Sequence, residues 1–261
     1  LMVRGALTVI IGTGLAALAG RLIHVLSLQA ALLWAIELTL IVSLIDLRRP
    51  WKNAIALADA LERDGLEGGR LALPTLSLRD PVHTDMYEVA RLGVEAIASS
   101  FSFGLIGPAL SYWFFGLGGL FAYQALILMS NRPGESQPFF MFGNRLAAAV
   151  EWPVSIIGAL TIVLAAFATK GAQPNGALLT IFDCYRTFIG VKNGPTVAAM
   201  AGALGLALEG PRRYVSGVIS RPWIGKGKAR AGPKEILAAT RLFLSGWLIV
   251  ASLIVVWLVL V

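Results

Sequence analysis

Long apolar stretches that recur along the chain constrain its fold more than any other feature. Two of them follow one another almost directly, at residues 5–26 and 29–47, and three more lie at 104–130, 150–168 and 242–261. A helix that crosses a bilayer needs about 20 mostly apolar residues. The sequence therefore predicts an all-α protein, a polytopic integral membrane bundle with about five transmembrane helices.

The composition supports this prediction and narrows the expected partners. Of the 261 residues, 57% are hydrophobic and 14% are charged, whereas soluble domains carry about 25% charged residues. The mean hydropathy is +0.74. Basic cytoplasmic loops explain the net charge of +7, and no interleaved aromatic and basic residues accompany it. We therefore expect the lipid bilayer, and no nucleic acid, as a partner.

The placement of the basic residues predicts the orientation in the membrane. The segment from Arg212 to Lys234 holds seven basic residues and no acid, and residues 48–52 hold three more basic residues. Loops rich in Lys and Arg stay on the cytoplasmic side. Residues 48–102 and 170–241 are therefore predicted to be cytoplasmic loops, which leaves the end of the last span outside.

Shorter helices are predicted within these polar segments. Apolar residues recur at helical spacing in Trp51–Asp64 and Asp85–Ser100, which indicates two amphipathic helices. The three glycines between residues 65 and 69 are expected to end the first of them. Pro195–Leu208 is apolar but too short to cross comfortably, which favours a buried, re-entrant or interfacial helix. Residues 1–261 are expected to form one membrane domain.

Few residues could serve metal or acid–base chemistry, and no metal site is predicted. The single cysteine, Cys184, excludes a cysteine-built site, and the two histidines, His24 and His83, lack ligand spacing. We expect His24, in an apolar stretch, to have a hydrogen-bonded packing role. Glu37 lies near the middle of an apolar stretch, where an acid is costly unless it faces protein or water. A packing hydrogen bond and a functional role are both open for Glu37.

Four stretches, in a fixed order, resemble one family of membrane proteins over nearly the whole chain. The most specific is Ala198-Ala-Met-Ala-Gly-Ala-Leu-Gly205, with Leu208-Glu-Gly210 just after it. The others are Val42-Ser-Leu-Ile-Asp-Leu-Arg48; Arg79-Asp80 with Ala90-Arg-Leu-Gly-Val-Glu95-Ala-Ile and Gly104-Leu-Ile-Gly-Pro108; and Gly119-Leu-Phe-Ala-Tyr123-Gln-Ala125. By these stretches the chain resembles the CobD/CbiB family, the membrane-bound adenosylcobinamide-phosphate synthases, to which the AmpE proteins are related.

The chain departs from the family pattern where the family carries acids and other polar groups. The family elements are Glu-Asn-x-x-Asp, Asn-Thr-x-Asp-Ser-Met, Leu-Asp-Asp-Leu and Ser-Pro-Asn-Ala-Gly. The positions that correspond to them here are Ser99, Ser100, Phe103, residues 127–132, Ala147, Ala148 and residues 190–194. The matches that survive are mainly Gly, Ala, Tyr and Pro positions, which set backbone geometry and close packing.

The resemblance implies an ATP-dependent reaction that joins an aminopropanol phosphate to a corrinoid carboxylate. Such a reaction forms an activated carboxyl phosphate and needs Mg²⁺, whose usual ligands are carboxylate oxygens. Because the acids are replaced together, we interpret the chain as a catalytically degenerate family member. On this interpretation it is an accessory or scaffold subunit of a membrane complex in the bacterial cytoplasmic (inner) membrane, with protein partners and no cofactor.

Two other interpretations are open. The chain could be an active amide-forming enzyme that uses Mg-ATP, with Asp80, Glu95, Asn193 and Glu209 as candidate catalytic residues. It could also be an AmpE-like regulatory membrane protein. On the plainer interpretation of the acids themselves, Glu95 is a solvated helix acid and Asp80 caps a helix.

Overall fold

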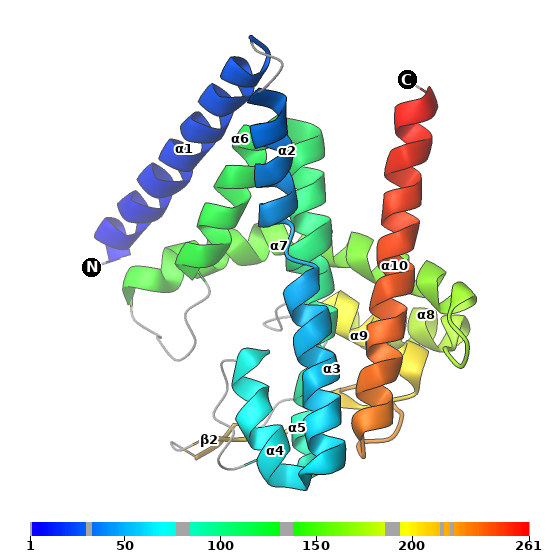
Figure 1. The fold of residues 1–261 in the computed structure, drawn as a ribbon. Helices are drawn as coiled ribbons and strands as arrows, with labels where there is room; N and C mark the ends of the chain where they lie inside the picture. The colour runs from blue at the N-terminus through cyan, green and yellow to red at the C-terminus, as the bar shows by residue number, and fades with distance from the viewer. Residues whose placement is uncertain are drawn as a thin grey trace. The chain divides into compact units, whose positions relative to one another are not determined.

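The chain is almost entirely helical, with four short strands, in the residues that its structure describes (Figure 1). The structure is a computed structural model, and it describes residues 2–29, 33–76, 84–130, 138–185, 194–214, 217–219 and 222–260. The helices in these residues confirm the predicted fold class, an all-α membrane protein. The chain divides into two compact units, residues 1–46 with 103–154 and residues 47–102 with 155–261.

Closely packed helices build the first unit. They are α1 (Met2–Ser27), α2 (Leu33–Leu44), α6 (Gly107–Ser130) and the beginning of α7 (Pro138–Ala168). α1 packs against α6, and a Cβ atom on Gly20 would lie 2.5 Å from the carbonyl oxygen of Leu117. Small residues of this kind let membrane helices approach each other. One hydrophobic cluster of this unit consists of Val9, Leu126 and Ala147, surrounded by Met129, Phe142, Leu146 and Val150.

α6 consists of two half-helices joined at Gly116. Gly116 has φ 62° and ψ −156°, outside the helical range. Residues with a Cβ atom rarely adopt such a positive φ, whereas glycine adopts it readily. By themselves, Gly116, Gly118 and Gly119 fit either one closely packed helix or two half-helices, and the structure shows the second arrangement.

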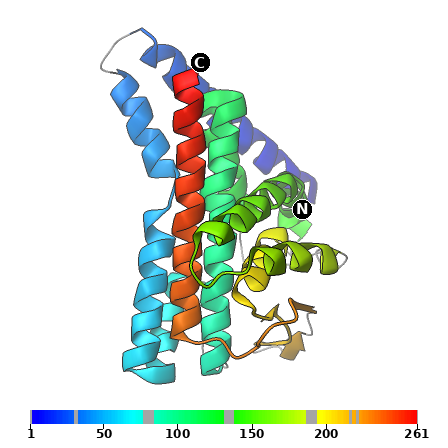
Figure 2. The same ribbon diagram turned by 90° about the vertical axis from the view of Figure 1, so that its right-hand side faces the viewer.

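Three long helices pack against one another in the second unit. They are α3 (Arg48–Arg63), α5 (Met86–Ser100) and α10 (Pro233–Leu260) (Figure 2). α3 buries Ala54, Leu57, Ala58 and Leu61, which recur every three or four residues and so form one apolar face. α5 buries a similar face that includes Val94 and Ile97. Both predicted amphipathic helices are therefore confirmed.

The turn after α3 differs from its prediction. Two short helices follow, α4 (Gly65–Ala72) and η1 (Leu73–Thr75). Of the three glycines expected to end α3, only Gly65 lies at the break, with φ 63°. Gly68 and Gly69 lie inside α4, and a Cβ atom on Gly68 would be 2.7 Å from the carbonyl oxygen of Ala60. These two glycines do not break a helix; they let α4 fold closely against α3.

Two short helices and two strand pairs lie in the described part of the chain between α7 and α10. The elements are α8 (Pro174–Asp183), α9 (Gly194–Leu204), β1 (Leu208–Glu209), β2 (Arg212–Tyr214), β3 (Gly217–Ile219) and β4 (Trp223–Ile224). β1 pairs with β4 and β2 with β3, both antiparallel. α9 is buried from Gly194 to Ala203, and a Cβ atom on Gly176 of α8 would lie 2.6 Å from the carbonyl oxygen of Gly202. The short apolar segment is thus a buried helix.

Four helices in the described chain are long and apolar enough to cross a membrane, namely Met2–Ser27, Met86–Ser130, Phe139–Ala168 and Pro233–Val256. They overlap four of the five predicted spans. The predicted span 29–47 contains α2, whose 12 residues rise about 18 Å, less than the roughly 30 Å of a bilayer core. Residues 30–32, just before α2, lie outside the described chain. α7 begins at Pro138, well before the predicted residue 150, because apolar residues precede Glu151 as well as follow it.

Asp85 caps the N-terminus of α5. Its Oδ1 atom accepts a hydrogen bond of 2.7 Å from the backbone N–H of Glu88. Asp85→Ala is expected to lower the free energy of unfolding by about 1 kcal/mol, whereas Asp85→Asn keeps an acceptor oxygen and should change it little. Equilibrium unfolding of the full-length protein in mixed SDS–detergent micelles measures both values. Equal losses for the two variants would contradict the capping role.

Candidate functional site

Two of the four predicted catalytic residues, Glu95 and Glu209, meet in the second unit. Glu95 lies on the buried face of α5 and Glu209 lies in β1, and they are only 5% and 6% exposed. The Oε1 atom of Glu95 accepts a hydrogen bond of 2.8 Å from the backbone N–H of Glu209. Glu95 is therefore not the solvated helix acid of the plainer interpretation. Because both residues are buried, loss of this hydrogen bond would leave a polar group without a partner, which costs free energy.

The backbone at Glu209 has an uncommon conformation that fixes this contact. Glu209 has φ 61° and Gly210 has φ 76°; a positive φ is uncommon for a residue other than glycine. The antiparallel pairing of Glu209 with Trp223 holds the strand in place. A Cβ atom on Gly210 would lie 2.7 Å from the Trp223 ring, so a glycine is required there. The strand and the Trp223 ring together present the Glu209 N–H to α5.

Arg91, which lies one turn before Glu95 on α5, contacts Ala229 and the ring of Trp223. Arg91 and Glu95 are four residues apart and so share one face of the helix. The Nη1 atom of Arg91 donates a 2.6 Å hydrogen bond to the carbonyl oxygen of Ala229, and its guanidinium lies 5.3 Å from the centroid of the Trp223 ring, within cation–π range. The sequence prediction missed Arg91 and Trp223. The spacing of Arg91 and Glu95 was a usable signal, whereas no pattern pointed to Trp223.

The stretch in which the family motif is altered continues as helix. α5 passes into α6 through one π-helical turn, η2 (Phe101–Ile106), without a loop. The hydroxyls of Ser102 and Thr196 share a buried 2.5 Å hydrogen bond, and Thr196 donates in turn to the carbonyl oxygen of Ser155 at 3.0 Å. π-Helical turns are frequent at functional sites. In this chain the turn carries hydroxyl contacts between packed helices.

Ala147, one of the two positions where the family has paired acids, belongs to the core of the first unit. Its side chain is 0% exposed and packs with Val9 and Leu126. Ala148 is exposed. A carboxylate at position 147 would be removed from water among apolar neighbours, which is strongly unfavourable for a charge. Position 147 therefore contributes packing in this chain.

Glu37, the acid within the second apolar stretch, is held by hydrogen bonds within the first unit. The Nδ1 atom of His24 lies 2.9 Å from its Oε1 atom. The Ser27 hydroxyl donates to Oε2 at 2.5 Å, and the Tyr112 hydroxyl donates to Oε1 at 3.3 Å. These contacts join α1, α2 and α6. They support a packing hydrogen bond for Glu37 and confirm a hydrogen-bonded role for His24.

The other predicted catalytic residues, Asp80 and Asn193, fall outside the described residues. Among the residues that are described, no group of three or more His, Cys, Asp or Glu side chains is placed to hold a metal ion.

Beyond β4, Lys226 Nζ lies 2.7 Å from Asp183 Oδ2. This hydrogen bond and the charge of Asp183 raise the pKa of Lys226. An exposed pair of this kind adds little stability.

Known proteins resemble the chain over most of its length. The family model described as CobD/Cbib protein matches residues 1–243. A Sinorhizobium sp. protein named Cobalamin biosynthesis protein CobD is 31% identical over 258 residues, which cover 96% of this chain and 80% of the relative. Proteins of the same name from Rhizobium meliloti (strain 1021) and Brucella melitensis biotype 1 are 33% and 36% identical, covering 92% and 76% of this chain and 74% and 64% of the relatives. No solved structure matches the chain. The family match and these identities together show that the chain belongs to the CobD/CbiB family.

Proposed function

We propose that this chain is a cobalamin-biosynthesis membrane protein that does not form the amide bond itself. It serves instead as an accessory subunit of a membrane complex in the bacterial cytoplasmic membrane, with residues 48–102 and 170–241 on the cytoplasmic side. The observation that carries this proposal is the contact of Glu95. Its carboxylate is 5% exposed and accepts a hydrogen bond from the Glu209 backbone, which is a structural task.

The chemistry of the family reaction supports the same conclusion. Formation of an amide from a carboxylate with ATP requires Mg²⁺ held by several oxygen ligands. In the residues that the structure covers, acidic side chains do not gather in the number that a metal ion needs. Position 147, which carries an acid in the family, lies among apolar side chains. For the described residues, these two observations support the proposal that the chain forms no amide bond itself.

Genetic complementation tests the catalytic half of the proposal. The full-length gene is expressed in a bacterium that lacks its own adenosylcobinamide-phosphate synthase, and growth that depends on newly completed cobalamin is scored. We expect no growth, with the protein shown by immunoblot to be in the membrane fraction. The Rhizobium meliloti relative, expressed from the same vector, is the positive control. Growth supported by this chain alone would overturn the proposal.

Purification from native membranes tests the accessory half. The tagged protein, expressed from its own locus and extracted in a mild detergent, is expected to elute with a stable protein partner. Deletion of the gene should lower cobalamin production by the host, and an Asp85→Asn copy, which leaves Glu95 and Glu209 unchanged, should restore it. Elution as a monodisperse monomer, with unchanged cobalamin production in the deletion strain, would contradict an accessory role.

One observation favours the alternative of an active amide-forming enzyme. Glu95 and Glu209 are both buried and in contact, and Arg91 lies one turn from Glu95 on α5. Buried acids with a cation one helical turn away are also found at catalytic sites. On this alternative, Glu95→Gln would abolish ATP-dependent consumption of a corrinoid acid and leave the fold intact. If the chain is instead a non-catalytic subunit, the purified wild-type protein consumes no corrinoid acid.

A further inference from the structure

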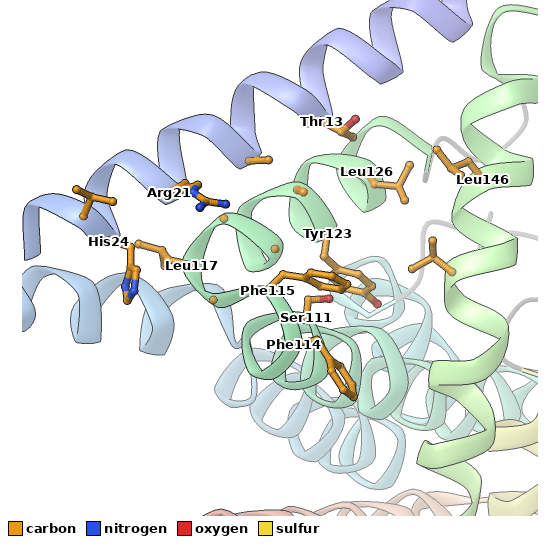
Figure 3. Close-up of a pocket in the computed structure, with 17 residues that line it drawn as sticks. Thr13, Arg21, His24, Ser111, Phe114, Phe115, Leu117, Tyr123, Leu126 and Leu146 are labelled. Atoms are coloured by element: carbon orange, nitrogen blue, oxygen red, sulfur yellow. The ribbon is translucent and has the colours of Figure 1, made fainter. Parts of the chain in front are cut away.

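A cavity in the first unit lies between α1, α6 and α7 (Figure 3). Its volume is about 820 Å³, within the range of ligand sites in proteins. α1 contributes Thr13, Ala17, Arg21 and His24, whose spacing of three or four residues places them on one helix face. α6 contributes mainly apolar and aromatic side chains, and α7 contributes Leu146 and Val150. The cavity is thus formed within the helices of a single unit.

One end of this cavity carries Arg21 and His24, and the Nδ1 atom of His24 also lies 2.9 Å from the Oε1 atom of Glu37. Figure 3 shows Arg21 and His24 at one end, and Leu126 and Leu146 toward the other. Arg21 leaves α1 where α1 meets the break in α6, since a Cβ atom on Gly118 would lie 3.6 Å from the Cβ atom of Arg21. A Cβ atom on Gly116 would meet nothing within 4 Å. The break in α6 therefore leaves open space beside this contact.

The remainder of the cavity is apolar, with one buried hydroxyl. Phe114, Phe115 and Leu126 line it. Tyr123 also lines it and is 4% exposed, and its hydroxyl has no hydrogen-bond partner within the described part of the chain. Buried hydroxyls are normally paired. This hydroxyl packs against Gly107 of α6, so Tyr123 offers the cavity its ring.

We propose that the cavity binds an anionic phospholipid from the surrounding bilayer, with its phosphate at Arg21 and its acyl chains against Phe114, Phe115 and Leu126. A basic residue at one end of an apolar pocket between membrane helices is suited to such a headgroup. α1 also exposes apolar side chains suited to contact with lipid, since Leu15, Leu18 and Leu22 are 62%, 66% and 61% exposed. An inorganic anion, which has no acyl chains, would gain no binding free energy from the apolar side chains that line the cavity. This inference is independent of the proposed function.

Native mass spectrometry of the full-length protein, released from nanodiscs that contain equal parts phosphatidylglycerol and phosphatidylcholine, tests the charge at Arg21. The wild-type protein should retain phosphatidylglycerol in preference to phosphatidylcholine. Arg21→Gln is expected to weaken this retention about fivefold, the effect of one basic residue near an anionic headgroup. Arg4→Gln removes a charge from the same helix outside the cavity and should have no effect. Arg21→Lys keeps the charge and should keep most of the retention, which separates loss of charge from misfolding.

A second pair of variants tests the apolar part of the cavity. Ala17 lines the cavity, whereas Ala19 is exposed on α1 and does not line it. Ala17→Leu should reduce retention of phosphatidylglycerol, and Ala19→Leu should not. Addition of millimolar inorganic phosphate should leave the lipid in place. Equal retention by the wild-type and Arg21→Gln proteins, or displacement of the lipid by phosphate, would overturn the inference.

Discussion

Glu95→Leu is expected to lower the free energy of unfolding of the full-length protein by about 2–3 kcal/mol. Leucine has a similar volume but leaves the buried N–H of Glu209 without the acceptor that now lies 2.8 Å away. Loss of a partner exposes the full desolvation cost of the remaining group, because water does not reach residues that are only 5% and 6% exposed. Equilibrium unfolding in mixed SDS–detergent micelles measures the difference.

Glu95→Gln is the matched control for this prediction. Its amide oxygen can accept the same hydrogen bond without a charge, so the expected loss is about 1 kcal/mol or less. Glu88→Leu replaces an acid in the first turn of the same helix, and it tests whether any loss of an acid from α5 is as costly. If Glu95→Leu unfolds at the same SDS concentration as the wild-type protein, Glu95 has no structural role and the enzyme alternative gains support.

Gly20→Ala should destabilise the packing of α1 by about 1–3 kcal/mol, the usual cost of overpacking. The added methyl group would lie 2.5 Å from the carbonyl oxygen of Leu117, which is backbone and cannot rotate away. Gly5→Ala should act in the same direction, because its Cβ atom would overlap the carbonyl oxygen of Phe139. The midpoint of SDS unfolding, measured on the full-length protein, reports both changes.

Gly14→Ala is the control on the same helix. A Cβ atom at Gly14 would meet nothing within 4 Å, and alanine is a better helix former than glycine. Its stability is expected to stay the same or to rise slightly. If the Gly5→Ala, Gly14→Ala and Gly20→Ala proteins all have the same midpoint of SDS unfolding, α1 does not pack on α6 and α7 through its glycines.

The apolar stretches and the amphipathic helices could be predicted from the sequence because they depend on local composition and spacing. The length of α9 indicated a buried, re-entrant or interfacial helix, and the sequence did not choose among these three. The conformation of Gly116 could be narrowed only to two alternatives, since the same glycines serve close packing and a positive φ. The early start of α7 does not follow from the sequence, because the acid Glu151 interrupts the apolar residues, although Glu151 is only 3% exposed in the structure.

The candidate site was harder to predict than the fold. Glu95 and Glu209 could be singled out by their family motifs, but 114 residues separate them along the chain. Their contact depends on the positive φ of Glu209 and on the Trp223 ring beneath Gly210. Neither the backbone conformation of Glu209 nor the position of the Trp223 ring follows from the local sequence pattern. The burial of Glu95 was therefore missed, because its helix neighbours alone resemble those of a solvated acid.

The enclosure of α9 has a consequence for how the protein is made. α9 has 11 residues, too few to enter a bilayer on its own as a span. Its neighbours are α5, α8 and α10, and α10 is the last element of the described chain. Synthesis proceeds from the N-terminus, so α9 leaves the ribosome before α10 exists to cover it. The nascent chain must therefore keep this apolar helix partly uncovered until α10 has been made and can pack on it.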